Sequence, residues 1–101
     1  MDKLIKAREE ISSIDREMAA LFVRRMNAVR DVSEYKSEHG LPIYDAAREE
    51  SLLAANAALV ENDELRGYYV EFLRDTMKIS RRFQEKLTEG MRVAFCGVEG
   101  A

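Results

Sequence analysis

The sequence has few of the residues that disulfides, turns and membrane spans require. Its 101 residues include one Cys, one Pro, five Gly and no Trp. A single cysteine excludes an internal disulfide and a zinc site built from several cysteines. The net charge of −3 lacks the basic excess that is typical of nucleic-acid-binding proteins. No apolar run approaches the roughly 20 residues of a membrane span, and charged residues crowd the N-terminus where a signal peptide would be apolar. We therefore expect a cytoplasmic protein with neither nucleic-acid nor membrane partners.

The sequence does contain a long helical repeat of apolar residues. Neither Gly nor Pro occurs before Gly40 and Pro42. Apolar residues recur at alternating spacings of three and four, at Leu4, Ala7, Ile11, Ile14, Met18, Leu21, Ala28, Val32 and Tyr35. This heptad spacing predicts one helix from about Asp2 to Glu38. At 1.5 Å per residue it is about 55 Å long, whereas a compact 100-residue domain is roughly 35 Å across. Because the helix overhangs its own domain, we expect a second copy to cover it in an intertwined homodimer.

Two further helices are predicted, so the fold class is all-α. Asp45 is the predicted N-cap of the second helix, and Asn62 or Asp63 is the predicted N-cap of the third. Apolar residues supply one face of the second helix at Leu52, Leu53, Leu59 and Val60. They follow helical spacing in the third at Leu65, Tyr69, Phe72, Leu73, Met77, Phe83 and Leu87. Gly90 is the predicted end of the third helix.

Residues 91–101 differ in character from the rest. The sequence predicts a short strand over residues 91–96 and a glycine-rich turn over residues 97–101. A single strand has no partner in an otherwise helical domain. The segment is therefore either a disordered tail or the beginning of a further domain, and we divide the chain into residues 1–90 and 91–101.

Charged residues occupy positions of the first helix where the heptad pattern predicts apolar side chains. Arg25 falls on the apolar seam, and Arg8 and Lys36 lie in the partly apolar row beside it. A buried guanidinium is costly unless it is paired, so an ion pair with Glu49 or another acid is one interpretation of Arg25. Arg8 and Lys36, taken singly, are also explained as the solvated flank of a helix pair. A binding pocket would explain all three.

Polar residues on the other two helices allow the same pair of interpretations. Thr76, Ser80 and Gln84 share one side of the third helix at spacings of four, where they face water, bond to backbone carbonyls or line a pocket. The start of the second helix carries residues that capping and the helix dipole explain by themselves, namely Asp45, Arg48 and Glu49.

Taken together, the set is rich in cations and hydrogen-bond donors, with one strong acceptor. It comprises Arg8, Arg25, Lys36, Arg48, Ser80, Gln84 and the acceptor Glu49. His39 lies at the predicted end of the first helix, and Cys96 lies in the tail. The sequence therefore identifies no pair of a nucleophile and a general base that includes either residue. No glycine-rich phosphate loop occurs. We expect a site that binds a small polyanion without a metal, a cofactor or covalent chemistry.

In this order, the same residues resemble the all-helical chorismate mutase family, which isomerises chorismate to prephenate. The resemblance covers residues 4–88. It is carried by Arg8-x-x-Ile11-x-x-Ile14-Asp15, by Arg25 and Lys36, by Asp45-x-x-Arg48-Glu49 and by Ser80-x-x-x-Gln84. It implies a homodimer with antiparallel first helices and two equivalent sites. Seventeen residues separate Arg8 from Arg25, about 26 Å along one helix, and antiparallel pairing brings Arg8 of one chain near Arg25 of the other.

The resemblance also implies a role for each pocket residue. Arg25 and the partner's Arg8 hold the two substrate carboxylates, and Ser80 assists them. Lys36 and Gln84 donate hydrogen bonds to the ether oxygen of the bond that breaks.

The remaining roles concern the second helix and one departure from the family. Glu49, together with the backbone near Arg48, accepts the ring hydroxyl, and Asp45 lies at the edge of the pocket. Arg81 falls near the pocket wall at a position where an apolar residue also occurs in the family, and the sequence does not show which way its side chain points.

Residues 93–101 are similar to the opening strand and turn of prephenate dehydratase, with Cys96 where glutamine is more usual. The resemblance implies that residues 1–90 are the mutase domain of a bifunctional enzyme of phenylalanine and tyrosine biosynthesis, followed by a truncated dehydratase domain. Two alternatives stay open. An isochorismate-processing lyase on the same fold would explain the cations. A non-catalytic helical dimerisation module would explain the heptads but not Arg25, Ser80 and Gln84. Glu49 and the tail favour the mutase.

Overall fold

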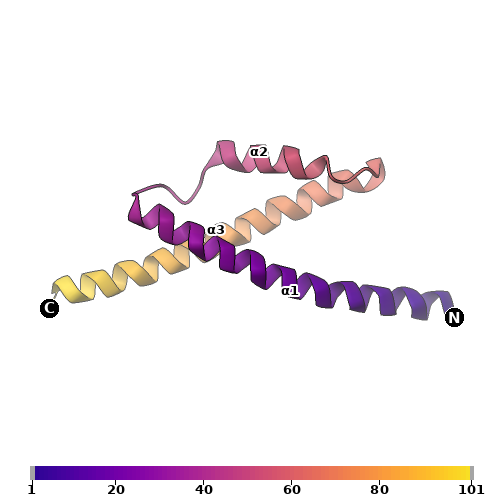
Figure 1. The fold of residues 1–101 in the computed structure, drawn as a ribbon, viewed down its shortest axis with the longest axis horizontal. Helices are drawn as coiled ribbons and strands as arrows, with labels where there is room; N and C mark the ends of the chain where they lie inside the picture. Colours follow the sequence, from indigo (N-terminus) through magenta and orange to yellow (C-terminus); the bar gives the residue numbers. More distant parts are fainter. Residues whose placement is uncertain (1, 101) are drawn as a thin grey trace.

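Three helices make up the part of the chain that the computed structural model describes, which is the backbone of residues 2–100 and the side chains of residues 2–90. They are α1 (Asp2–Glu38), α2 (Ala46–Ala57) and α3 (Asp63–Gly100). The two long helices cross, and α2 lies along the first half of α3 (Figure 1). The chain is elongated, with extents of 66 × 29 × 15 Å and a radius of gyration of 18.3 Å. A compact chain of this length has a radius of gyration near 13 Å, so much of each long helix extends beyond the packed region.

The predicted bounds of α1 are confirmed, and its C-terminus shows why the helix stops there. Gly40 has a φ of +64°, the left-handed conformation that glycine adopts without steric cost. The N–H of Leu41 then donates to the carbonyl of Lys36 at 2.8 Å, and the N–H of Gly40 donates to the carbonyl of Ser37 at 3.5 Å. This pair of bonds is a Schellman motif, which satisfies the last free carbonyls of the helix.

Side-chain caps begin the other two helices. Asp45 Oδ1 accepts the N–H of Arg48 at 3.0 Å at the start of α2, and Asn62 Oδ1 accepts the N–H of Leu65 at 3.2 Å at the start of α3. Both predicted starts are therefore confirmed, with Asn62 as the cap. The predicted apolar face of α2 extended too far, because the helix ends at Ala57 and Leu59 is 73% exposed in the turn that follows.

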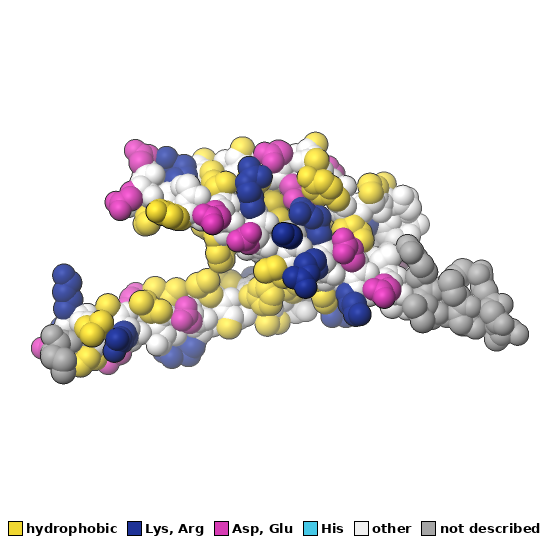
Figure 2. Space-filling view, turned by 180° about the vertical axis from the view of Figure 1, so that it is seen from behind, with side chains coloured by type: hydrophobic (Ala, Val, Ile, Leu, Met, Phe, Trp, Pro, Cys, Tyr) yellow, Lys and Arg dark blue, Asp and Glu magenta, His cyan; other side chains and the backbone are white. Residues whose placement is uncertain are grey.

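The buried core is small and lies where α2 packs on α3. Its buried hydrophobic residues, within the described side chains, are Leu53, Leu73 and Met77. In contrast, every residue of α1 from Asp2 to Arg24 is exposed. Figure 2 shows apolar side chains along this uncovered helix. The large ones are Leu4, Ile5, Ile11, Ile14, Met18, Leu21, Phe22 and Val23. None of the described helices has the length and hydropathy that crossing a bilayer requires.

The prediction of a helix end at Gly90 and a strand over residues 91–96 is wrong for the backbone, because α3 continues to Gly100. A glycine inside a helix costs only about 1 kcal/mol relative to alanine. A strand without a neighbour leaves its backbone groups unpaired, whereas a helix satisfies them within its own segment. The side chains of residues 91–100, including Cys96, lie outside the described part of the structure. The predicted similarity of this segment to a dehydratase stays a prediction.

Candidate functional site

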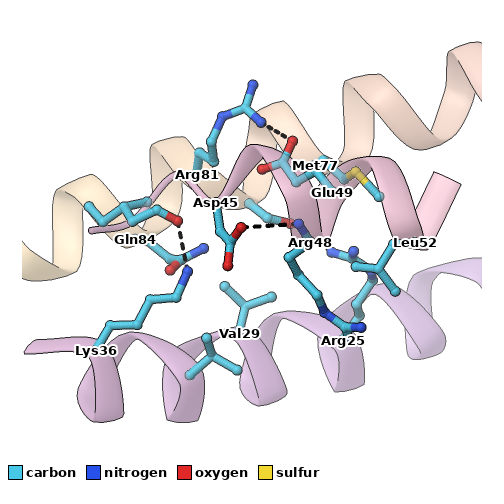
Figure 3. Close-up of a pocket in the computed structure, with 13 residues that line it drawn as sticks. Arg25, Val29, Lys36, Asp45, Arg48, Glu49, Leu52, Met77, Arg81 and Gln84 are labelled. Carbon is cyan, nitrogen blue, oxygen red and sulfur yellow. Dashed lines mark hydrogen bonds and ion pairs between the residues drawn. The ribbon is translucent and has the colours of Figure 1, made fainter. Parts of the chain in front are cut away.

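A pocket of about 200 Å³ lies where the three helices meet, lined by residues from all of them and from the α1–α2 connection (Figure 3). Seven of the eight predicted site residues line it: Arg25, Lys36, Asp45, Arg48, Glu49, Ser80 and Gln84. The walls between them are apolar and comprise Val29, Val32, Ile43, Leu52 and Met77. The structure therefore brings residues that are up to 59 positions apart in sequence into one small cavity.

Arg25 is held at one end of the pocket by α3. Its Nη1 donates to Ser80 Oγ at 2.6 Å, and Ser80 Oγ in turn donates to the carbonyl of Thr76 at 2.9 Å. The ion pair with Glu49 that the sequence allowed is not formed. A guanidinium has five N–H donors, so Arg25 keeps donors for an anion after binding Ser80. Thr76 itself bonds back to the carbonyl of Phe72 at 2.8 Å and does not line the pocket.

Lys36 and Gln84 approach the same part of the pocket from different helices. Lys36 Nζ donates to the carbonyl of Ile43 at 2.8 Å, which leaves two of its three N–H groups available. Gln84 is 7% exposed, and its Oε1 is buried with no hydrogen-bond partner among the described side chains and backbone. Figure 3 shows both side chains directed into the cavity. Unmet hydrogen-bonding capacity inside a pocket favours the binding of a polar ligand.

Asp45 and Arg48 lie at the N-terminal end of α2, on the exposed side of the pocket. The carboxylate of Asp45 caps the helix through the N–H of Arg48, and the Asp45 carbonyl accepts the N–H of Glu49 at 3.0 Å. Both backbone donors near Arg48 are therefore already used within the helix. At this position the side chains, rather than the backbone, are available to a ligand.

Glu49 forms an ion pair with Arg81, which crosses from α3 to α2. The guanidinium of Arg81 also lies over the ring of Tyr44, 4.6 Å from the ring centroid. The hydrogen bond to Glu49 is the main reason that the pKa of Arg81 is raised above its ordinary value. Arg81 therefore stays charged at every pH at which the protein is handled. The sequence placed Arg81 near the pocket wall, but only the structure shows its direction and its partner.

Arg8 lies outside this pocket. It is exposed on the uncovered half of α1, beside Ile5, Glu9, Ser12 and Arg16. Seventeen residues of continuous helix separate it from Arg25, about 26 Å. Arg8 and Arg25 of the same chain therefore cannot contact one small ligand.

The pocket is cationic. It is lined by four cationic side chains, those of Arg25, Lys36, Arg48 and Arg81, and by the two carboxylates of Asp45 and Glu49. The lining therefore has a formal excess of two positive charges. Within residues 2–90, no group of three or more His, Cys, Asp or Glu side chains is arranged to hold a metal. The arrangement favours a small dianion with further polar groups, held by fixed donors against apolar walls.

The chain is similar in sequence to one protein family and to several curated proteins. The sequence profile of a family described as "Chorismate mutase type II" matches residues 7–85. The chain is 36% identical over 86 residues to the T-protein of Haemophilus influenzae, a match that covers 85% of this chain and 21% of that protein. It is 42% identical over 53 residues to the T-protein of Enterobacter agglomerans, covering 52% of this chain and 14% of that protein.

An archaeal relative is shorter. The chain is 37% identical over 49 residues to the protein named "Chorismate mutase" of Methanocaldococcus jannaschii, covering 48% of this chain and 50% of that protein. This chain thus spans about a fifth of the first T-protein and half of the archaeal protein. No solved structure matches the chain significantly.

Proposed function

The chain belongs to the chorismate mutase type II family, and from this premise we propose that it is an isomerase that converts chorismate to prephenate. The observation that carries the proposal is the pocket itself, in which Arg25, Lys36, Glu49 and Gln84 converge. Chorismate has two carboxylates, an ether oxygen and a ring hydroxyl. The pocket offers cations, donors and an acceptor that match these groups in kind.

The reaction is a concerted pericyclic rearrangement, so it needs no nucleophile and no proton transfer. An enzyme accelerates it by holding the substrate in the chair-like diaxial conformer, in which the reacting atoms are close. Paired carboxylate anchors impose that conformer. In our proposal Arg25 binds one carboxylate with the donors that Ser80 leaves free, and its guanidinium binds bidentately while remaining charged.

Negative charge develops on the ether oxygen as the C–O bond breaks. Hydrogen-bond donors that are already in place stabilise that charge without reorganisation during the reaction. Such electrostatic stabilisation of the transition state is usually the largest single contribution to an enzyme's rate enhancement. Lys36 has two N–H groups left after its bond to Ile43, and the amide of Gln84 is buried beside it. We assign the ether oxygen to these two side chains and the ring hydroxyl to the carboxylate of Glu49, since the backbone donors near Arg48 are engaged by Asp45.

The second carboxylate requires a partner chain. We propose an antiparallel homodimer in which the partner's Arg8 completes each pocket. The exposed apolar residues of α1 between Leu4 and Val23 support this, because a patch of that extent on a soluble protein marks an interface. So does the core, which has only three buried hydrophobic residues among the described side chains and is small for an independently stable domain. Light scattering should give twice the chain mass of 11.6 kDa.

The assay for the function is the loss of chorismate absorbance on addition of the protein, with prephenate identified by its conversion to phenylpyruvate in acid. Lys36→Ala should abolish turnover. Arg74→Met, on the same face of α3 as the α2 contact but outside the pocket, should leave it unchanged. Pyruvate release from isochorismate without chorismate turnover would favour the lyase. Inactivity on both substrates would favour the dimerisation module and overturn the proposal.

The biological setting follows from the reaction and is part of the same proposal. Prephenate is the common precursor of phenylalanine and tyrosine, so the enzyme would act in aromatic amino acid biosynthesis, in the cytoplasm. A longer bifunctional chain with a prephenate dehydratase domain after residue 90 stays a prediction.

A further inference from the structure

Arg81 lines the pocket and forms an ion pair with Glu49, but the roles proposed above for the pocket residues do not include it. The ion pair joins three segments at one point. Tyr44 comes from the α1–α2 connection, Glu49 from the first turn of α2, and Arg81 from α3. Figure 3 shows the guanidinium of Arg81 reaching over to the carboxylate of Glu49 at the rim of the pocket.

We propose that Arg81 is a positioning residue that fixes the Glu49 carboxylate for the substrate hydroxyl and offsets its charge. This inference rests on the proposed function, because it concerns how one part of that site works. The first step is geometric. Arg81 binds Oε1 of Glu49, so the other carboxylate oxygen is left to accept a hydrogen bond. The guanidinium also lies over the ring of Tyr44, so Arg81 has a second contact that restrains it.

The second step is electrostatic. The substrate is a dianion, and an unpaired carboxylate in the pocket would repel it at short range. Arg81 places a permanent positive charge against Glu49, so the carboxylate keeps its ability to accept a hydrogen bond while its repulsion of the substrate is offset. The side chains of the pair are only 27% and 20% exposed, so solvent screens the interaction less than it screens a surface pair.

A second ion pair between the same two helices provides a matched control. Arg74 Nη1 lies 3.4 Å from Glu50 Oε1, and these side chains are 58% and 67% exposed. Neither residue lines the pocket. If Arg81 served only to tie α2 to α3, removing Arg74 would have a similar kind of effect. If Arg81 positions Glu49, only its own removal affects the reaction.

The experiment measures kcat and KM for chorismate and for an analogue with hydrogen in place of the ring hydroxyl. The proteins are the full chain as wild type, Arg81→Met, Arg81→Lys, Glu49→Gln, the Arg81→Met/Glu49→Gln double variant and Arg74→Met. Arg81→Met should lower kcat/KM for chorismate by about tenfold, the value of one charge-assisted hydrogen bond. The loss should fall mainly on KM, because the hydroxyl takes no part in the bond rearrangement and is bound equally in the ground state and the transition state.

Four further results are expected. The same variant should lose less on the analogue than on chorismate, because the analogue keeps the two carboxylates that an unpaired Glu49 repels but has no hydroxyl to be bound. Arg81→Lys should recover part of the loss, and Arg81→Met should add little once Glu49 is Gln, because the two changes remove one interaction. Arg74→Met should behave as wild type. Arg81→Lys retains the charge, so it tests the proposal even if the methionine variant does not fold.

The outcomes separate the two proposals. No turnover of chorismate by the wild type would overturn the proposed function and this inference with it. With an active wild type, three results would each overturn the inference alone. These are equal losses on chorismate and the analogue, an undiminished effect of Arg81→Met in the Glu49→Gln background, and an equal loss from Arg74→Met.

Discussion

Two inactive variants, Arg8→Ala and Arg25→Ala, are expected to regain activity when their subunits are mixed. The reason is the distance between the two side chains. The pocket of about 200 Å³ is roughly 7 Å across, whereas Arg8 and Arg25 lie about 26 Å apart along α1, so one chain cannot supply both to one substrate. In the proposed dimer, a mixed pair of chains has one site that lacks both arginines and one site in which both are intact.

The magnitude follows from counting sites. Each single variant alone should retain about 1% of wild-type kcat or less, since the loss of one preorganised donor costs about 10²–10³. Random exchange of equal amounts yields about half heterodimers with one intact site of two, hence about a quarter of wild-type activity. Co-expression with two different affinity tags, followed by purification on both, should raise the recovery to about half. The assay is the initial rate of chorismate loss before and after exchange.

The control is a mixture of Arg25→Ala with Lys36→Ala. Both side chains line the same pocket of the same chain, so every site of every dimer in that mixture is damaged. No activity should return. Recovery in the control, or none in the Arg8 and Arg25 mixture when tags prove that subunits have exchanged, would refute the shared site.

Three further predictions concern single side chains. Gln84→Glu should turn over chorismate at low pH and lose kcat as pH rises, because the carboxyl beside Lys36 ionises and then repels the developing charge on the ether oxygen. A profile of kcat against pH parallel to that of the wild type would contradict this. Ser33, 2% exposed with its Oγ unpaired within the described residues, should give a more stable protein as Ser33→Ala, by about 1 kcal/mol in chemical unfolding, whereas a destabilised variant would reveal a partner. Asp45→Ala should lower the free energy of unfolding by about 1 kcal/mol through loss of the α2 cap, and Asp45→Asn should restore most of it.

The helices could be predicted from sequence because their signals are local. Heptad spacing and Gly40 defined α1, and the side chains of Asp45 and Asn62 marked the starts of the next two helices. Local signals failed where a choice depends on neighbours. Gly90 is compatible with a helix end and with a helix interior, and residues 91–96 have strand propensity, but the described part of the chain contains no strand with which they could pair.

Arg25 could be identified from the sequence because it interrupts an apolar pattern on α1, whereas Asp45, Arg48 and Glu49 are explained by helix capping and were assigned to the site through the family resemblance. Their contacts could not be derived in the same way. Nothing in the sequence shows that Arg25 bonds to Ser80 while Glu49 bonds to Arg81, because both arginines are long and flexible and the choice depends on how α2 and α3 pack. The role of Arg8 stays a prediction for a different reason, since a single chain does not contain the surface on which that residue would act.

The uncovered half of α1 has a consequence for how the protein is made. Residues 2–24 are all exposed in the described part of the structure, and a helix in a protein owes most of its stability to the packing of its apolar face. For the proposed dimer, this half would become fixed only when two chains meet. Recovery of activity after dilution from denaturant should then follow second-order kinetics, with a half-time that falls as protein concentration rises. The unassembled chain would be open to proteases near its N-terminus, and association would protect that segment.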